Sequence, residues 1–253
     1  MFTFRDRAPS QGRADQGAGV GSVDVAFTDR HGGVSGPPFD SLDLSRSRPD
    51  GDRELSENFA LVAAAFGVSG FATMRQVHGA DVREVDNIGP TTDPCDALVT
   101  RTPGVALCVR VGDCVPVVLA DAGHGVVGVA HVGRPGMVAG VVAATVGAMC
   151  RLGASDIDAY VGPHICGACY EVPAVMRAEV SRSVPASFAC TSWGSPSVDI
   201  GAGVAAQLRQ AGCVVHDVAV CTRESADLYS YRRDGQGSGR SAGLAVLREP
   251  PDG

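Results

Sequence analysis

The sequence predicts a single α/β (α+β) domain in which mixed β-sheets are covered by helices. Short apolar runs of strand length alternate along the chain with longer segments of helical spacing. At 253 residues, the chain is long enough to bury a sizeable core without disulfides or metals. The sequence contains no internal repeat and no linker long enough to divide it, so we expect these elements to share one domain.

The first half of the chain is expected to consist mainly of strands. Residues 1–21 are polar and rich in glycine, which indicates a flexible N-terminal arm before a folded domain over 22–253. Helical spacing predicts a helix over 53–66, and Gly67 follows as a stop signal. Strands are predicted at 22–29, 71–77, 82–85, 96–100 and 105–111, and a pair of strands at 114–119 and 125–130.

The second half is expected to supply most of the helices. The Ala- and Val-rich stretch 137–152 predicts one buried helix that begins just after Pro135, because proline is favoured near a helix start. Further helices are predicted at 172–183 and 200–211, and strands at 157–161, 214–218 and 242–247. The stretches 162–170 and 230–235 are predicted to be loops.

Composition and charge exclude several classes of protein. The net charge of −7 speaks against nucleic-acid binding, which depends on neutralising phosphates. No apolar run reaches the roughly 18 residues of a membrane helix, and the N-terminus lacks the apolar core of a signal peptide. We therefore expect a cytoplasmic protein with no nucleic-acid or membrane partner. In that compartment Cys108, Cys150 and Cys213 are expected to be small buried hydrophobes, not disulfides.

Three residues at the ends of predicted strands are candidate metal ligands. His78 stands in RQVHGAD, Cys114 in GDCVPVV and His131 in VAHVGRPG. Taken singly, each is a weak signal, because a histidine can be an ordinary surface residue and a cysteine a buried structural one. Together, two imidazoles and one thiolate are typical of a catalytic zinc site, whose fourth position stays open. Asp113 precedes Cys114 and suggests a polar pocket at that strand entry.

A second group of cysteines leaves its role open. Cys166 and Cys169 form a Cys-x-x-Cys pair in PHICGACYE, which is compatible with a redox or a metal-binding role. No second Cys-x-x-Cys pair exists in the sequence, so a structural zinc at this place would need distant partners.

Several motifs in order make the chain resemble the YfiH/YlmD-like laccase-domain family, formerly called multicopper polyphenol oxidases. The resemblance spans about residues 22–247. The motifs are GGVS-x-PP-x-x-SL (32–42), QVHGADV (76–82), DALVT (96–100), DCVPVVLAD (113–121), VAHVGRPG (129–136), GPHICGACYEV (162–172), CT (221–222) and SYRRDGQGSGR (230–240).

The resemblance implies a fold, a metal and an activity. His78, Cys114 and His131 fall on the family's zinc ligands, with copper the less favoured metal. The implied activity is phosphorolysis of adenosine, inosine, guanosine and methylthioadenosine, together with deamination of adenosine, by a monomer. Cys114, His131 and Asp113 are the candidate catalytic residues. The candidate contacts to nucleoside and phosphate are Asp43, Arg134, His164, Tyr170 and Arg232, with Arg233 a further candidate guanidinium.

The chain departs from the family pattern at three of these positions. Arg134 stands where the pattern has tryptophan, and the arginine that usually follows is here Pro135. Asp43 replaces an asparagine, and a carboxylate cannot donate as an amide does. His164 replaces a small residue. These changes bear on the phosphate and nucleoside contacts and leave the predicted metal ligands intact.

Three other readings stay open. In a cysteine or zinc amidohydrolase, such as a cell-wall precursor amidase, Cys114 would be the nucleophile and His131 its base. Copper-dependent polyphenol oxidation would need many histidine ligands, whereas the chain has six histidines and no His-x-His pair. A protein that buffers metal or binds a partner would hold metal without turning over a nucleoside.

Overall fold

The computed structural model describes residues 1–8, 22–45 and 52–249, which form two six-stranded sheets packed face to face. In the first sheet the strands follow the order β1 (Phe2–Ala8), β2 (Val23–Thr28), β14 (Ser241–Leu247), β7 (Ala106–Val111), β3 (Phe71–Arg75) and β5 (Gly89–Pro94). In the second sheet the order is β13 (Val214–Asp217), β10 (Asp158–Val161), β8 (Val115–Asp121), β9 (Val126–Val132), β6 (Ala97–Thr100) and β4 (Val82–Glu84). Both sheets mix parallel and antiparallel pairs.

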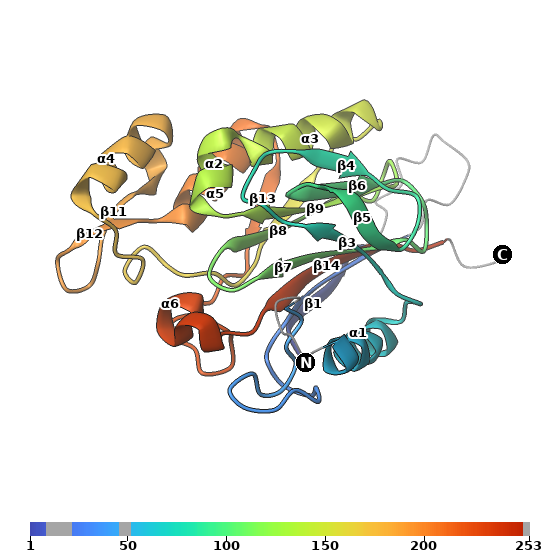
Figure 1. The fold of residues 1–253 in the computed structure, drawn as a ribbon. Coiled ribbons are helices and arrows are strands. Elements are labelled where there is room, and N and C mark those ends of the chain that lie inside the picture. The colour runs from blue at the N-terminus through green and yellow to red at the C-terminus, as the bar shows by residue number, and fades with distance from the viewer. Residues whose placement is uncertain (9–21, 46–51, 250–253) are drawn as a thin grey trace.

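Helices cover the outer faces of both sheets (Figure 1). Helix α1 (Asp52–Phe66) lies on the first sheet, and α2 (Arg134–Ala139), α3 (Val141–Arg151) and α5 (Ile200–Gln210) lie on the second. Helix α4 (Ala174–Ser183) packs beside the small β11 (Phe188–Cys190) and β12 (Pro196–Val198) sheet, and the one-turn α6 is Tyr231–Asp234. The result is a four-layer arrangement of helix, sheet, sheet and helices.

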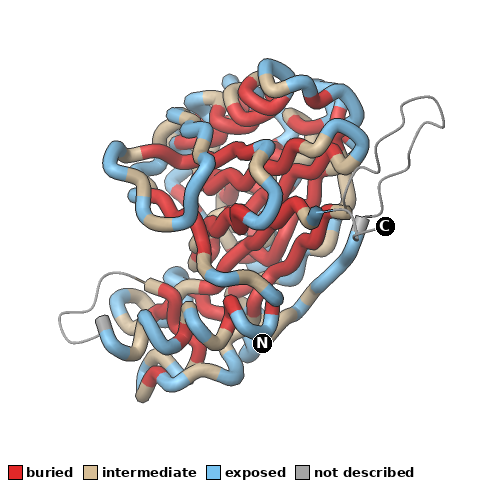
Figure 2. The backbone as a smooth tube through the Cα atoms, turned by 90° about the vertical axis from the view of Figure 1, so that its right-hand side faces the viewer, coloured by how far each residue is buried: buried red, intermediate tan, exposed pale blue. Residues whose placement is uncertain are grey.

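Three hydrophobic cores fill the spaces between these layers. The central core lies between the sheets and includes Val25, Leu107 and Val129, all of them fully buried. The other two cores lie between each sheet and its helices. Figure 2 shows buried backbone running through the middle of the molecule and exposed backbone along its outer loops and helices. Strands buried on both faces explain why the sequence carries near-continuous apolar runs instead of alternation.

The structure confirms the mixed α/β class and most of the predicted elements. The helix predicted at 53–66 and the strand pair on either side of residues 122–125 are present. No helix in the described part of the chain is long and apolar enough to cross a membrane.

Several local predictions were wrong, each for a physical reason. The predicted arm contains β1, which pairs with β2, while 9–21 lie outside the described residues. The single helix predicted at 137–152 is broken at Gly140, whose φ of 87° ends α2 and starts α3. Strand β5 was missed because its two prolines argue against a strand, and its edge position tolerates them. Cys150 is exposed, unlike the buried Cys108 and Cys213.

Candidate metal centre and cleft

His78, Cys114 and His131 meet at one edge of the two sheets. His78 follows the end of β3, Cys114 directly precedes β8, and His131 lies near the end of β9. One donor atom from each residue lies within 4.8 Å of the others. The Cys114 Sγ is 3.7 Å from His78 Nε2, and the two imidazole centroids are 4.7 Å apart. The structure thus brings together three residues that the sequence separates by up to 53 positions.

Strand register and one glycine produce this convergence. In the antiparallel β8–β9 pair, Val115 lies opposite Val132, so Cys114 comes next to Gly133. A Cβ at Gly133 would lie 2.5 Å from His78 Cδ2 and 3.1 Å from Cys114 Sγ. The position therefore requires glycine, because any side chain would displace the histidine ring. His78 itself has a φ of 60°, which is uncommon for a residue with a side chain.

Asp96 holds two of the three residues in place. This fully buried carboxylate accepts hydrogen bonds from the backbone N–H groups of Val77, His78 and Gly79. It also bonds the His131 Nδ1 at 2.8 Å, which leaves the His131 Nε2 for a metal. A carboxylate that orients a ligating imidazole in this way is typical of metal sites. Sequence reasoning missed Asp96, although an acidic residue directly before a buried strand was a usable signal.

The electrostatics of the group favour a thiolate. Burial by itself would raise the pKa of Cys114, but hydrogen bonds from His131 and His78 outweigh it and lower the pKa to about 6. Burial would likewise lower the pKa of His131, and its bonds to Asp96 and Cys114 raise it instead. A thiolate with two imidazoles is a donor set that suits Zn²⁺, so the residues present fit the ion implied by the resemblance.

The three residues open into a cleft of about 1080 Å³. Its walls carry five arginines, which are Arg75, Arg110, Arg134, Arg232 and Arg240. Among the described residues lining the cleft, Asp113 is the only acid. A cationic cleft in a chain of net charge −7 is suited to an anionic ligand. Sequence reasoning missed Arg75, Arg110 and Arg240, because nothing in the sequence shows which arginines face this edge.

Of the predicted substrate contacts, Arg134, Tyr170 and Arg232 line the cleft. The Arg232 guanidinium lies 4.8 Å from the centroid of the Tyr170 ring, and its Nη1 donates to the Glu171 carbonyl. In the described part of the chain, the Arg134 side chain makes no hydrogen bond or ion pair and so remains available to a ligand.

Two other predicted residues, Asp113 and Asp43, have their carboxylates engaged within the protein. Asp113 lines the cleft, but its carboxylate accepts hydrogen bonds from the Thr222 hydroxyl and the Arg232 backbone N–H, each at 2.6 Å. Asp43 is buried away from the lining and accepts from Ser45 and the Arg240 backbone. Through these contacts Asp113 and Asp43 help to shape the cleft wall.

His164 and Arg233 also lie outside the cleft lining. His164 is buried, its Nδ1 bonds the Gly162 carbonyl, and its ring fills the space where Gly201 lacks a side chain. Arg233 donates to the carbonyls of Thr222, Arg223, Ser225 and Leu228 and pairs with Asp234. The Arg233 guanidinium therefore holds a loop in this structure, and a contact to phosphate remains a prediction.

With this geometry established, comparison with known proteins places the chain in a family. Residues 24–248 match the family described as multi-copper polyphenol oxidoreductase laccase, and the chain belongs to that family. A protein of Streptomyces coelicolor named purine nucleoside phosphorylase is 50% identical over 239 residues, which is 90% of this chain and 97% of the relative. A protein of the same name from Streptomyces griseus is 48% identical, over 90% of this chain and 96% of its own.

The fold also matches solved structures. The YlmD protein of Geobacillus stearothermophilus superposes with a TM-score of 0.79 at 28% identity, over 90% of this chain and 92% of that one. A hypothetical protein YfiH from Bacillus licheniformis gives the same TM-score at 25% identity, over 89% of this chain and 93% of its own. The predicted YfiH/YlmD-like resemblance is thereby confirmed.

Proposed function

We propose that this protein is a zinc-dependent purine nucleoside phosphorylase, acting on adenosine, inosine, guanosine and methylthioadenosine, with adenosine deaminase activity in the same cleft. The observation that carries the proposal is the His78, Cys114 and His131 group at the wall of an arginine-lined cleft. Relatives that bear the name purine nucleoside phosphorylase support it over 90% of the chain. We further propose a monomer located in the cytoplasm.

The three ligands give the site its chemistry. A Zn²⁺ ion held by His78, Cys114 and His131 would supply Lewis acidity and activation of water. Asp96 keeps the His131 ring turned so that one nitrogen faces the group, and it anchors the backbone that carries His78. The half-buried Cys114 supplies the negative charge that makes this donor set suit zinc.

In this proposal the arginines bind phosphate, and the ring of Tyr170 binds the purine. A guanidinium group can donate two hydrogen bonds to a pair of phosphate oxygens. Arg134 and Arg75 line the cleft, and in the described structure their side chains make no hydrogen bond within the protein. Developing charge on the phosphate and on the departing base is stabilised by such preorganised cations. Tyr170, with Arg232 over its ring, offers a flat surface on which a purine can stack.

The test is phosphate-dependent release of hypoxanthine from inosine by the purified protein, measured together with its metal content. The expected result is about one zinc per chain at this site and activity that depends on phosphate. Replacing His78→Ala should remove the zinc at this site and the phosphate-dependent activity. Activity that persists in His78→Ala, or that is equal without phosphate, would contradict the proposal. Copper in place of zinc, with oxidation of a phenol, would instead support the polyphenol oxidase reading.

One observation favours a second candidate, an amidohydrolase in which Cys114 is the nucleophile. His131 and His78 lower the pKa of Cys114, which is what a cysteine nucleophile requires. Here His131 would act as base and Asp96 would orient it. The two candidates respond differently to reagents. A chelator should abolish the zinc-dependent activity and spare the cysteine hydrolase, while a thiol alkylator should abolish the hydrolase.

A further inference from the structure

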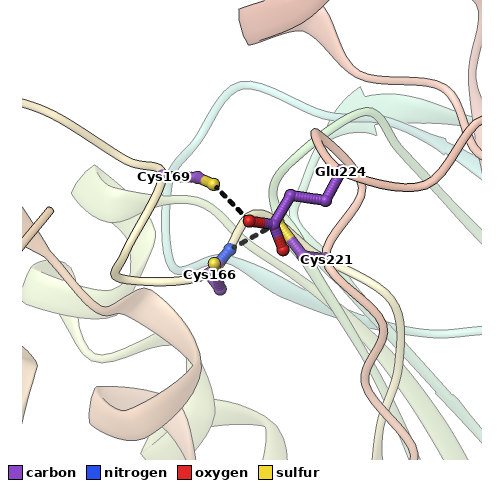
Figure 3. A group of neighbouring side chains, drawn as sticks. All are labelled: Cys166, Cys169, Cys221 and Glu224. Carbon is purple, nitrogen blue, oxygen red and sulfur yellow. Dashed lines mark hydrogen bonds between the residues drawn. The ribbon is translucent and has the colours of Figure 1, made fainter. Parts of the chain in front are cut away.

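A second group of potential metal ligands lies apart from the first, between two loops. Cys166 and Cys169 come from the loop after β10, and Cys221 and Glu224 from the loop after β13. One donor atom from each of the four residues lies within 4.8 Å of all the others. Figure 3 shows the four side chains turned toward a common centre, with Cys169 near the Glu224 carboxylate.

The two loops present their ligands at the same spacing. Cys166-Gly-Ala-Cys169 is matched by Cys221-Thr-Arg-Glu224, so each loop places two donors three positions apart. Such short loops, each with two ligands, are typical of structural zinc sites. A Cys-x-x-Glu segment therefore supplies the distant partners that the Cys-x-x-Cys pair needs. A search for cysteine pairs does not detect such a segment.

Backbone hydrogen bonds hold the loops in register, so the convergence is built into the fold. The Thr222 N–H donates to the His164 carbonyl at 3.0 Å, and the His164 N–H donates to the Val220 carbonyl at 3.2 Å. Within each loop, a turn closes around the first ligand: the Tyr170 N–H donates to the Cys166 carbonyl, and the Ser225 N–H donates to the Cys221 carbonyl.

We propose that Cys166, Cys169, Cys221 and Glu224 bind a second Zn²⁺ ion in a closed, structural site. Four donors at zinc distances of about 2.3 Å for sulfur and 2.0–2.2 Å for oxygen leave neighbouring donors less than about 4 Å apart in a tetrahedron. Donors already within 4.8 Å need to move inward by only a fraction of that distance. Thiolates select zinc over magnesium or calcium.

Two features of the surroundings suit a bound cation with thiolate ligands. The Cys166 N–H points at the Cys221 Sγ at 3.5 Å, a contact that stabilises a thiolate. Three thiolates and a carboxylate carry more negative charge than one Zn²⁺ neutralises, so a backbone donor aimed at one of the sulfurs suits the site. Cys169 is buried and Glu224 is exposed, so the carboxylate side gives the ion a path in from solvent.

A disulfide explains the arrangement less well. Pairing Cys166 with Cys169 or Cys221 would leave one thiol and the Glu224 carboxylate turned inward without a function. A metal ion uses all four donors. Residues next to the ligands reach the cleft, since Tyr170 lines it and the Thr222 hydroxyl bonds Asp113. The second zinc would therefore fasten the part of the cleft wall that carries Tyr170 and Arg232.

Zinc content per chain tests the proposal independently of nucleoside activity. Wild-type protein, purified without chelator, is expected to hold two zinc ions. Cys169→Ser and Cys114→Ser should each hold one, and the double variant none. Cys150→Ser, which changes an exposed cysteine outside both groups, should keep two. Equal zinc in Cys169→Ser and wild type, or none in folded Cys114→Ser, would overturn the proposal.

A spectroscopic measurement keeps the test decisive if Cys169→Ser fails to fold. The Cys114→Ser variant is produced with cobalt in place of zinc. Of the two proposed sites, only the second then still offers thiolate ligands. We expect it to show a near-ultraviolet thiolate-to-cobalt band and visible bands of tetrahedral Co²⁺. Absence of these bands, or a disulfide among the three cysteines in the unreduced protein, would overturn the proposal.

Discussion

Replacing Asp96→Asn should weaken metal binding without removing any ligand. The carboxylate accepts three backbone N–H groups and the His131 Nδ1. An asparagine keeps one acceptor oxygen and turns an NH₂ group toward donors such as the Gly79 N–H. Loss of a carboxylate that orients a metal ligand typically costs about 10–100-fold in metal affinity, or about 1.4–2.8 kcal/mol. We expect zinc affinity to fall by that factor.

The chain offers a matched control in Asp121→Asn. Asp121 is also buried and accepts hydrogen bonds from the backbone of His124, Ser155 and Asp156 and from the His124 ring. It ends β8, whose other end adjoins Cys114, roughly 23 Å away at 3.3 Å per residue. Both variants should lose about 1–3 kcal/mol of unfolding free energy, because each leaves buried donors unsatisfied.

The two variants should differ only in zinc affinity, measured by competition with a chelator of known affinity. Asp96→Asn should bind zinc 10–100-fold more weakly than wild type, and Asp121→Asn should match wild type. If Asp96→Asn keeps wild-type affinity, then Asp96 does not position the metal ligands. If Asp121→Asn weakens zinc binding equally, the loss of affinity results from general destabilisation of the fold.

Three further changes test other parts of the structure. Gly133→Ala should lower zinc affinity at least about tenfold, because its Cβ would lie 2.5 Å from a ligating imidazole; Gly36→Ala, with open space around its Cα, should leave affinity unchanged in the same chelator assay. Arg134→Ala should raise the KM for phosphate about tenfold or more, with the KM for nucleoside little changed, in steady-state assays that vary each substrate. At Asp24, burial alone would raise the pKa, but hydrogen bonds from Arg7 and Arg248 outweigh burial and lower it. The ionised Asp24 carboxylate therefore stabilises the fold fully above its unfolded-state pKa of about 3.9. This stabilisation is lost as the pH falls through the lower pKa of Asp24 in the folded state. Urea denaturation should show Asp24→Asn to be less stable than wild type at pH 7, with a difference that narrows below about pH 4; a constant difference down to pH 3 would contradict the shift.

The candidate metal ligands could be predicted from the sequence because each carries distinctive chemistry at a strand end. Two histidines and a cysteine stand next to buried apolar runs, and the structure brings them together. Periodicity could not supply Asp96, because its importance lies in the register of β6 against β9, which places it beside His131. For the same reason Arg75 and Arg240 were missed. Arg75 ends β3 and Arg240 directly precedes β14, and these strands are far apart in sequence and come near each other only through sheet order.

Comparison with the family pattern did not show which polar residues line the cleft. Asp43 and His164 stand at positions where the chain departs from the family pattern, and Arg233 stands within a shared motif. The polar side-chain atoms of all three form hydrogen bonds inside the protein. A family pattern shows which positions lie in or next to a motif. It does not distinguish a residue that touches substrate from one that holds the loop in place, and the hydrogen-bond partners make that distinction.

Asp113 shows how the two groups of ligands become parts of one structure. It directly precedes Cys114, and its carboxylate bonds the hydroxyl of Thr222, which directly follows Cys221. The other carboxylate oxygen bonds the backbone of Arg232 in the cleft wall. One buried acid therefore ties a ligand of the first group, a loop of the second and a cationic wall of the cleft together. The proposed zinc sites are then best understood as two fixed points between which the substrate-facing loops are held, with the first exposed to the cleft and the second closed.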